Sequence, residues 1–88
     1  MAQRSAVIAS KVGLHARPAA LFVKAVSASG IPVSISKGDG DPVDAASILA
    51  VMTLGAEQGD EVTLTADGDG AEKVLDELAE LLAQDLDA

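Results

Sequence analysis

Apolar residues along this chain switch repeatedly between strand-like and helix-like spacing, and this alternation restricts the fold more than any other feature of the sequence. Strand patterns, either short apolar runs or alternation with polar residues, occupy 4–10, 31–35 and 62–66, with a further short strand expected around Val43. Helices are predicted over 16–28, over 47–54 and in the stretch that follows Asp69. The resulting order, β-α-β-β-α-β-α, predicts an α+β fold in which amphipathic helices cover one face of a single sheet.

Glycine and acidic residues mark the ends of the predicted helices. Gly30 lies two residues after the end of the first predicted helix and Gly55 directly follows the second, positions at which glycine commonly ends a helix. Asp69 is followed three residues later by Glu72, an acidic form of the capping box, so Asp69 is the expected N-cap of the last helix. The helix dipole also favours carboxylates at that end.

The chain is short, and it must be stabilised by apolar packing. Its 88 residues suit one domain spanning 1–88, and the absence of cysteine excludes disulfides and thiolate metal clusters. Phe22 is the only aromatic residue, so the core must be packed from valine, leucine, isoleucine and alanine. For the same reason we expect no aromatic platform for bases or sugars, no large apolar pocket and no bound cofactor.

The charge of the chain argues against two classes of partner. Fourteen acidic and six basic residues give a net charge of −8, which opposes general binding to nucleic acid or to anionic lipid. The first residues lack the apolar run of a signal peptide, and no later stretch is long enough to span a membrane. We therefore expect a soluble, unsecreted protein in which any handling of phosphate is local. The absence of cysteine suits the cytoplasm, and we expect the chain to be a monomer.

The single histidine lies between the first strand and the first helix, in the segment GLHARPAA at 13–20. Pro18 falls in the first helical turn, where an amide has no intrahelical partner, while the amides of Ala16 and Arg17 remain able to donate. Together with the helix dipole and the Arg17 guanidinium, these amides would form an anion site beside His15. The same positive surroundings favour the neutral imidazole, which is the nucleophilic form. His15 is therefore the candidate phosphoryl acceptor.

The residues alone leave a structural interpretation of this segment open. His15 could simply cap the helix, and Arg17 could be a solvated surface residue. The chain has no second histidine, no cysteine and no carboxylate at a fixed local spacing, so neither a metal site nor a catalytic triad is expected. One histidine without a cofactor site also leaves little machinery for an independent enzyme.

Two segments of the chain resemble the HPr family, the phosphocarrier proteins of the bacterial phosphoenolpyruvate-dependent sugar phosphotransferase system. GLHARPAA at 13–20 closely resembles the active-site signature of that family, and SILAVMTLG at 47–55 resembles its regulatory-serine segment. The order and spacing of the elements agree over essentially the entire chain. The resemblance implies an open-faced β-sandwich, with a four-stranded antiparallel sheet of order 1-4-2-3 and three helices on one face.

The resemblance also implies a chemical role for the histidine. Phospho-enzyme I would donate a phosphoryl group to Nδ1 of His15, and sugar-specific IIA domains would receive it during carbohydrate uptake. Arg17 would balance charge in both transfers, and the backbone amide of Ala16 would contact the phosphate. The chain would then act as a covalent intermediate between enzymes and would not itself be an enzyme.

A docking surface follows from the same resemblance, because phosphoryl transfer depends on positioning and on charge that the partner helps to supply. The expected docking residues are apolar, exposed and close to His15: Phe22, Ile48, Leu49 and Met52. Periodicity alone could equally bury Ile48 and Met52. We favour docking for Phe22 and Leu49, and we assign Val51 to the core.

Ser47 has two interpretations. Serine is a preferred N-cap, so its hydroxyl could accept a hydrogen bond from an amide of the short helix, and we favour this structural role. By resemblance, a dedicated kinase phosphorylates this serine in some bacteria, and the added charge weakens docking. Regulated members often carry a basic residue directly before the serine, whereas this chain has Ala46.

Two other classes of protein are alternatives to a sugar-branch phosphocarrier. An acyl carrier protein is also small and acidic, but this chain has Ala46-Ser47-Ile48 in place of the Asp-Ser-Leu attachment motif, and its strand patterns do not suit an all-helical bundle. The second alternative is a purely regulatory paralogue, or a relative from the nitrogen branch of the phosphotransferase system that uses the same chemistry with other partners; the intact His15-Ala16-Arg17 keeps phosphate acceptance in either case. The sequence leaves the branch and the sugars served open.

Overall fold

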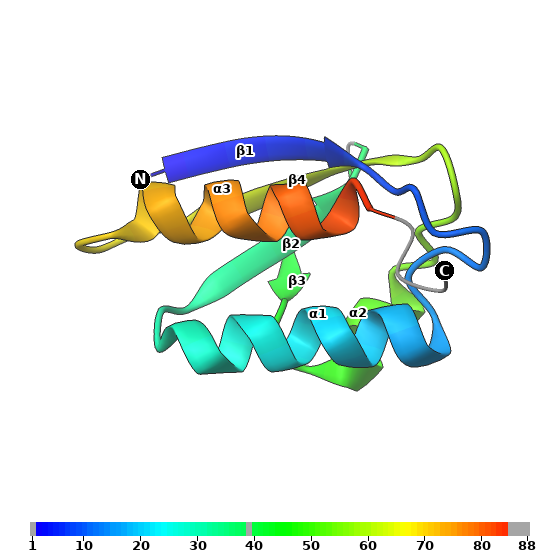
Figure 1. Cartoon of the computed structure of the whole chain (residues 1–88), viewed down its shortest axis with the longest axis horizontal. Helices are drawn as coiled ribbons and strands as arrows, with labels where there is room; N and C mark the ends of the chain where they lie inside the picture. Colours follow the sequence, from blue (N-terminus) through cyan, green and yellow to red (C-terminus); the bar gives the residue numbers. More distant parts are fainter. Residues whose placement is uncertain (1, 39, 85–88) are drawn as a thin grey trace.

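The computed structural model describes residues 2–38 and 40–84, and its elements follow the predicted order (Figure 1). Within those residues the strands are β1 (Ala2–Val7), β2 (Val33–Lys37), β3 (Val43–Asp44) and β4 (Glu61–Ala66). The helices of the same residues are α1 (Ala16–Ser29), α2 (Ile48–Thr53) and α3 (Ala71–Leu82). The β-α-β-β-α-β-α prediction is confirmed. No helix in the described part of the chain has the length and apolarity needed to cross a membrane.

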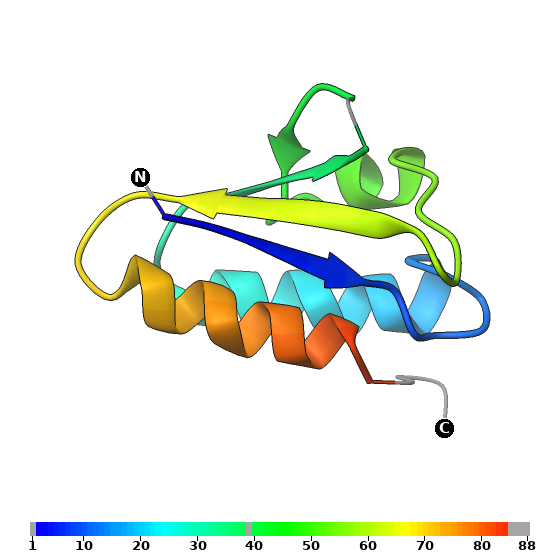
Figure 2. The ribbon, with the colours of Figure 1, turned by 90° about the horizontal axis from the view of Figure 1, so that it is seen from above.

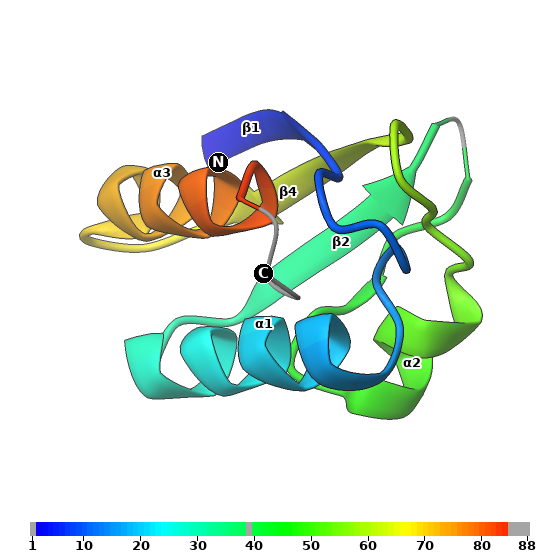
Figure 3. The same ribbon diagram turned by 45° about the vertical axis from the view of Figure 1, so that its right-hand side comes forward.

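The strands of the described residues form one four-stranded antiparallel sheet in the order β1-β4-β2-β3, as the resemblance implied. Helices α1 and α3 lie on the same face of this sheet (Figure 2), and α2 packs beside α1 (Figure 3). On the other face, Ser5, Thr63 and Ser36 align in one polar row across three strands. The fold is therefore the expected open-faced sandwich.

The core lies between the sheet and the helices. Its largest fully buried aliphatic and aromatic side chains come from every layer of the fold: Phe22, Ile8, Leu14, Ile35, Leu64, Leu75, Leu82, Val26, Val51 and Val62. Burial of each leucine, isoleucine or phenylalanine side chain stabilises the fold by about 1.5–3 kcal/mol. The core extends through Ile8 and Leu14 into the loop before α1, and this loop carries His15.

The end of β1 differs from the prediction. The strand ends at Val7, the last residue that pairs with β4, instead of continuing to Ser10. The amide of Ile8 donates instead to the carbonyl of Asp60, at 2.9 Å, in the loop that precedes β4. The residues after Val7 therefore belong to the loops near His15.

The start of α3 also differs from the prediction. Its N-cap is Gly70, with φ 82°, and no side chain caps the helix, so the assignment of Asp69 as N-cap is wrong. The amide of Ala71 donates to the carbonyl of Gly68 at 3.2 Å, and this backbone turn replaces the expected carboxylate cap. Glu72 still lies in the first turn, where the helix dipole favours it.

Candidate phosphorylation site

The loop that leads to His15 is held tightly against the segment before β4. Gly13 has φ 72°, and a Cβ atom at this position would lie 2.4 Å from the carbonyl oxygen of Ala56 and 2.8 Å from Cα of Glu57. Only glycine fits both the torsion and the close approach. The next residue, Leu14, is buried, and its amide donates to the Ala56 carbonyl at 2.8 Å. The backbone that enters His15 is therefore held against Ala56 both by close packing at Gly13 and by the hydrogen bond of Leu14.

His15 is the N-cap residue of α1. Its backbone is extended, with φ −127° and ψ 161°, and its carbonyl accepts the first intrahelical hydrogen bond from the amide of Ala19 at 3.5 Å. Its half-buried side chain makes no capping hydrogen bond. His15 thus occupies the N-cap position through its backbone, but its imidazole does not cap the helix. The interpretation of the side chain as a purely structural cap finds no support in the geometry.

The first amides of α1 are available to an anion. Among residues 2–38 and 40–84, the amides of Ala16 and Arg17 have no hydrogen-bond partner, and Pro18 has no amide to satisfy. A helix of this length carries about half a positive elementary charge at this end. Ala16 also has φ 48°, a left-handed conformation that is unusual for alanine and that functional sites often contain. The two predicted backbone donors are thus brought next to His15.

The Arg17 guanidinium is exposed and makes no hydrogen bond or ion pair with any residue that the structure describes. Two other basic side chains are already engaged, since Arg4 contacts carboxylates of α3 and Lys37 contacts Asp60. Arg17 is therefore free to contribute charge-assisted hydrogen bonds to a phosphoryl group.

The second helix presents an apolar surface to solvent. Leu49 is 72% exposed, and Ile48 and Met52 are also exposed, as expected for docking residues. Val51 is fully buried, which confirms its assignment to the core. Helix α2 packs against α1, the helix that begins at His15 (Figure 3). We name the exposed side chains of Ile48, Leu49 and Met52 the α2 surface.

The assignment of Phe22 to the docking surface is wrong. Phe22 is 0% exposed, and on α1 it lies between the buried Ala19 and Val26 at three- and four-residue spacing. It is the largest of the fully buried side chains and belongs to the hydrophobic core. The exposed large apolar residue of α1 is the preceding one, Leu21, at 38%. The 19-22-26 spacing was the signal that could have placed Phe22 in the core.

Ser47 is the N-cap of α2, and its Oγ accepts a hydrogen bond from the amide of Ala50 at 3.3 Å. The N-cap prediction is confirmed. The hydroxyl is half-buried and lies directly before the α2 surface along the chain. Phosphorylation of this serine stays a prediction.

Comparison with known proteins identifies the family. The profile described as "PTS HPr component phosphorylation site" matches residues 2–84 of the chain. This chain belongs to the HPr family. It is 52% identical over 87 residues to the phosphocarrier protein HPr of Streptomyces coelicolor, covering 99% of this chain and 94% of that protein.

Solved HPr structures share the fold. The HPr of Bacillus anthracis superimposes with a TM-score of 0.86 at 38% identity, over 92% of this chain and 95% of that one. An HPr from Thermoanaerobacter tengcongensis gives a TM-score of 0.85 at 40% identity, over 93% and 91%. The chain is thus an HPr phosphocarrier of the sugar phosphotransferase system, which carries a phosphoryl group and is not itself a catalyst, and the acyl-carrier alternative is wrong.

Proposed function

We propose that His15 is the phosphoryl acceptor of this HPr. One observation carries the proposal: at the start of α1 lie an imidazole that makes no capping hydrogen bond, two backbone amides and a guanidinium, and neither the amides nor the guanidinium have a partner among residues 2–38 and 40–84. Phospho-enzyme I donates the group and sugar-specific IIA domains receive it, in the cytoplasm and with this chain as a monomer.

In the proposed transfer, Nδ1 of neutral His15 attacks the phosphorus atom while the bond to the donor breaks, so that one bond to phosphorus replaces another. The transition state is loose, and its barrier is lowered mainly by positioning and by charge. The amides of Ala16 and Arg17 would meet the phosphoryl oxygens, and the Arg17 guanidinium would offset their negative charge. Passing the group to a IIA domain reverses these steps.

We assign partner docking to the α2 surface, with Leu21 of α1 in place of Phe22. These residues are exposed, apolar and carried by the two helices that pack together. An exposed apolar patch beside a reactive group is typical of a surface that partners cover. Phosphorylation of Ser47 by a serine kinase would add negative charge directly before this surface and would weaken docking of acidic groups.

The test is incubation of the protein with phosphoenolpyruvate and enzyme I. The expected product is an acid-labile, base-stable phosphate on His15, and phosphorus NMR is expected to assign it to Nδ1. His15→Ala should abolish the modification, and modification that persists in this variant would remove His15 from the mechanism. Reconstitution with enzyme I of the sugar branch and of the nitrogen branch, in parallel, identifies the donor.

A further inference from the structure

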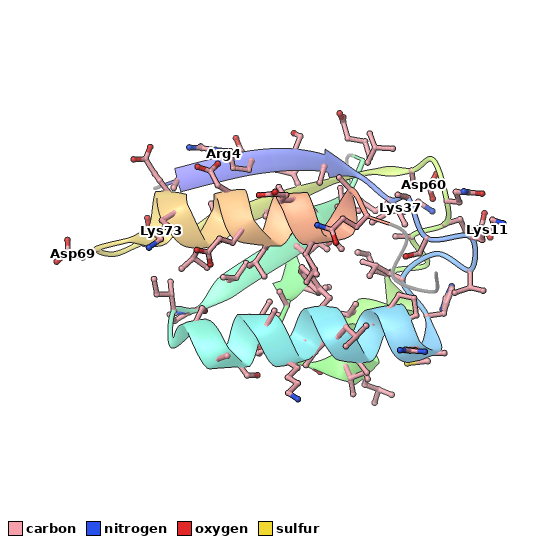
Figure 4. All side chains as sticks on the ribbon, in the orientation of Figure 1. Arg4, Lys11, Lys37, Asp60, Asp69 and Lys73 are labelled. Carbon is pink, nitrogen blue, oxygen red and sulfur yellow. The ribbon has the colours of Figure 1, made fainter. Side chains whose placement is uncertain are left out.

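Lys37, the last residue of β2, joins the two ends of the segment that supports the His15 loop. Its Nζ atom donates to the carbonyl oxygen of Gly55 at 3.1 Å and lies 3.3 Å from Oδ2 of Asp60. Figure 4 shows the labelled Lys37 and Asp60 side chains together at one end of the molecule, opposite Asp69. Because Gly55 and Asp60 begin and end the segment 55–60, a single ammonium group holds both of its ends.

Asp60 closes the turn inside this segment. Its Oδ2 atom accepts from the amide of Glu57 at 2.9 Å, and its own amide donates to the Glu57 carbonyl at 3.0 Å. The Glu57 amide and the Lys37 ammonium hold the pKa of Asp60 below its ordinary value, so the carboxylate is charged at neutral pH. Lys37 therefore faces a fixed anion and not a freely rotating side chain.

The segment 55–60 in turn holds the loop that carries His15. The amide of Gly59 donates to the carbonyl of Ile8 at 2.8 Å, where the loop leaves β1. At the other end of the loop, the Ala56 carbonyl accepts from the amide of Leu14, the residue before His15, at 2.8 Å. We therefore expect a shift of Ala56 to displace Leu14, because the two are joined by a hydrogen bond and the segments approach so closely at Gly13 that a Cβ atom would not fit there.

We propose that Lys37 is a positioning residue for phosphoryl transfer. By holding Gly55 and Asp60 it fixes the Ala56 carbonyl, and through Leu14 it fixes the position of His15 over the first amides of α1. Lys37 is not part of the α2 surface, but the amide of Gly55 donates to the carbonyl of Met52 at 3.3 Å, so the test must separate transfer from docking. An effect on the geometry of transfer lowers kcat, whereas an effect confined to docking raises KM and would overturn the proposal. The proposal rests on His15 as the acceptor, and phosphoryl transfer is sensitive to displacements of about 1 Å.

The test is Lys37→Gln, which removes the charge and keeps the length of most of the side chain. Steady-state transfer from enzyme I should show kcat lowered about three- to tenfold with KM for the carrier unchanged. Hydrogen exchange of the Leu14 amide, followed by NMR, should become faster while the circular dichroism spectrum stays that of the wild type. Lys37→Arg keeps the cation and its ability to donate to the Asp60 carboxylate, and it should keep kcat closer to the wild-type value than Lys37→Gln does.

Arg4→Gln is the matched control. Arg4 also forms an ion pair, at 2.7 Å with Asp76, and its side chain is 37% exposed against 41% for Lys37, but it joins β1 to α3 and does not contact the segment 55–60. This variant should leave kcat and the Leu14 amide unchanged. If Lys37→Gln keeps the wild-type kcat, or if Arg4→Gln lowers kcat equally, the proposal is overturned.

A second variant tests the proposal independently, in case Lys37→Gln does not fold. Asp60→Asn can still accept from the Glu57 amide but no longer attracts Lys37, and it should reproduce the lower kcat; an unchanged kcat in this variant overturns the proposal. Failure of the wild-type protein to be phosphorylated on His15 would instead overturn the proposed function. The hydrogen-exchange rate of the Leu14 amide distinguishes a failure of this proposal from a failure of the proposed function, because its measurement needs no phosphorylation.

Discussion

Gly13→Ala should destabilise the protein more than an ordinary glycine substitution, because two separate effects act at this position. An alanine with φ near 72° costs about 1–2 kcal/mol, since its Cβ crowds the following carbonyl. The new Cβ would also lie 2.4 Å from the Ala56 carbonyl oxygen, and backbone atoms cannot rotate away as a side chain can. Overpacking of this kind costs about 1–3 kcal/mol. We expect a total loss of about 2–5 kcal/mol, the sum of the two effects.

Gly30→Ala is the control, because Gly30 has the same φ of 72° and nothing lies within 4 Å of its Cβ position. Urea unfolding should show that Gly13→Ala is less stable than Gly30→Ala by at least about 1 kcal/mol, the overpacking cost, which corresponds to a difference of about 4–8 °C in melting temperature. Transfer from enzyme I should be slowed only in Gly13→Ala, since only that variant moves the His15 loop. Equal stability of the two variants would refute the close contact between Gly13 and Ala56.

Three further predictions follow from the site and the core. Arg17→Gln should lower kcat for transfer about tenfold or more, because hydrogen bonds to charged groups contribute about 1.5–3 kcal/mol. The urea midpoint of this variant should stay unchanged, and an unaltered kcat would exclude Arg17 from the transfer. Phe22→Ala should destabilise the fold by about 3–5 kcal/mol, whereas Leu49→Ala should raise KM for enzyme I without loss of stability. A raised KM with unchanged stability in Phe22→Ala would instead assign Phe22 to the docking surface. Asp60 has a lower pKa in the folded protein than its ordinary value of 3.8, so the unfolded chain binds the proton first as the pH falls. The stabilisation that the Asp60 carboxylate contributes should therefore be complete above pH 3.8 and should disappear as the pH falls through the lowered pKa of the folded state. Urea midpoints of the wild type and Asp60→Asn should therefore converge in acid, and a gap that stays constant with pH would contradict this.

The sequence by itself determined the features that depend on residues close together in the chain. Apolar spacing predicted the order of strands and helices, and serine before a short helix predicted the N-cap at Ser47. The segment around His15 predicted an imidazole next to free amides, because the first amides of a helix have no intrahelical partner wherever the helix lies. Its resemblance to the HPr family supplied the strand order, which periodicity alone did not define.

Tertiary structure decided the features that depend on distant residues. Phe22 and Leu21 are neighbours in sequence; the spacing of Phe22 from Ala19 and Val26 favours its inward position, and the folded chain shows that Phe22 is fully buried while Leu21 is exposed. Local signals favoured Asp69 as a cap, yet the backbone turn at Gly68 took its place. Two contacts join segments that lie far apart along the chain: Gly13 with Ala56, and Lys37 with Asp60. No pattern of neighbouring residues predicts them. These contacts form only when the loops before α1 and β4 meet at one end of the sheet. The motif therefore places His15 next to the first amides of α1, whereas the fold alone places it next to the segment 55–60.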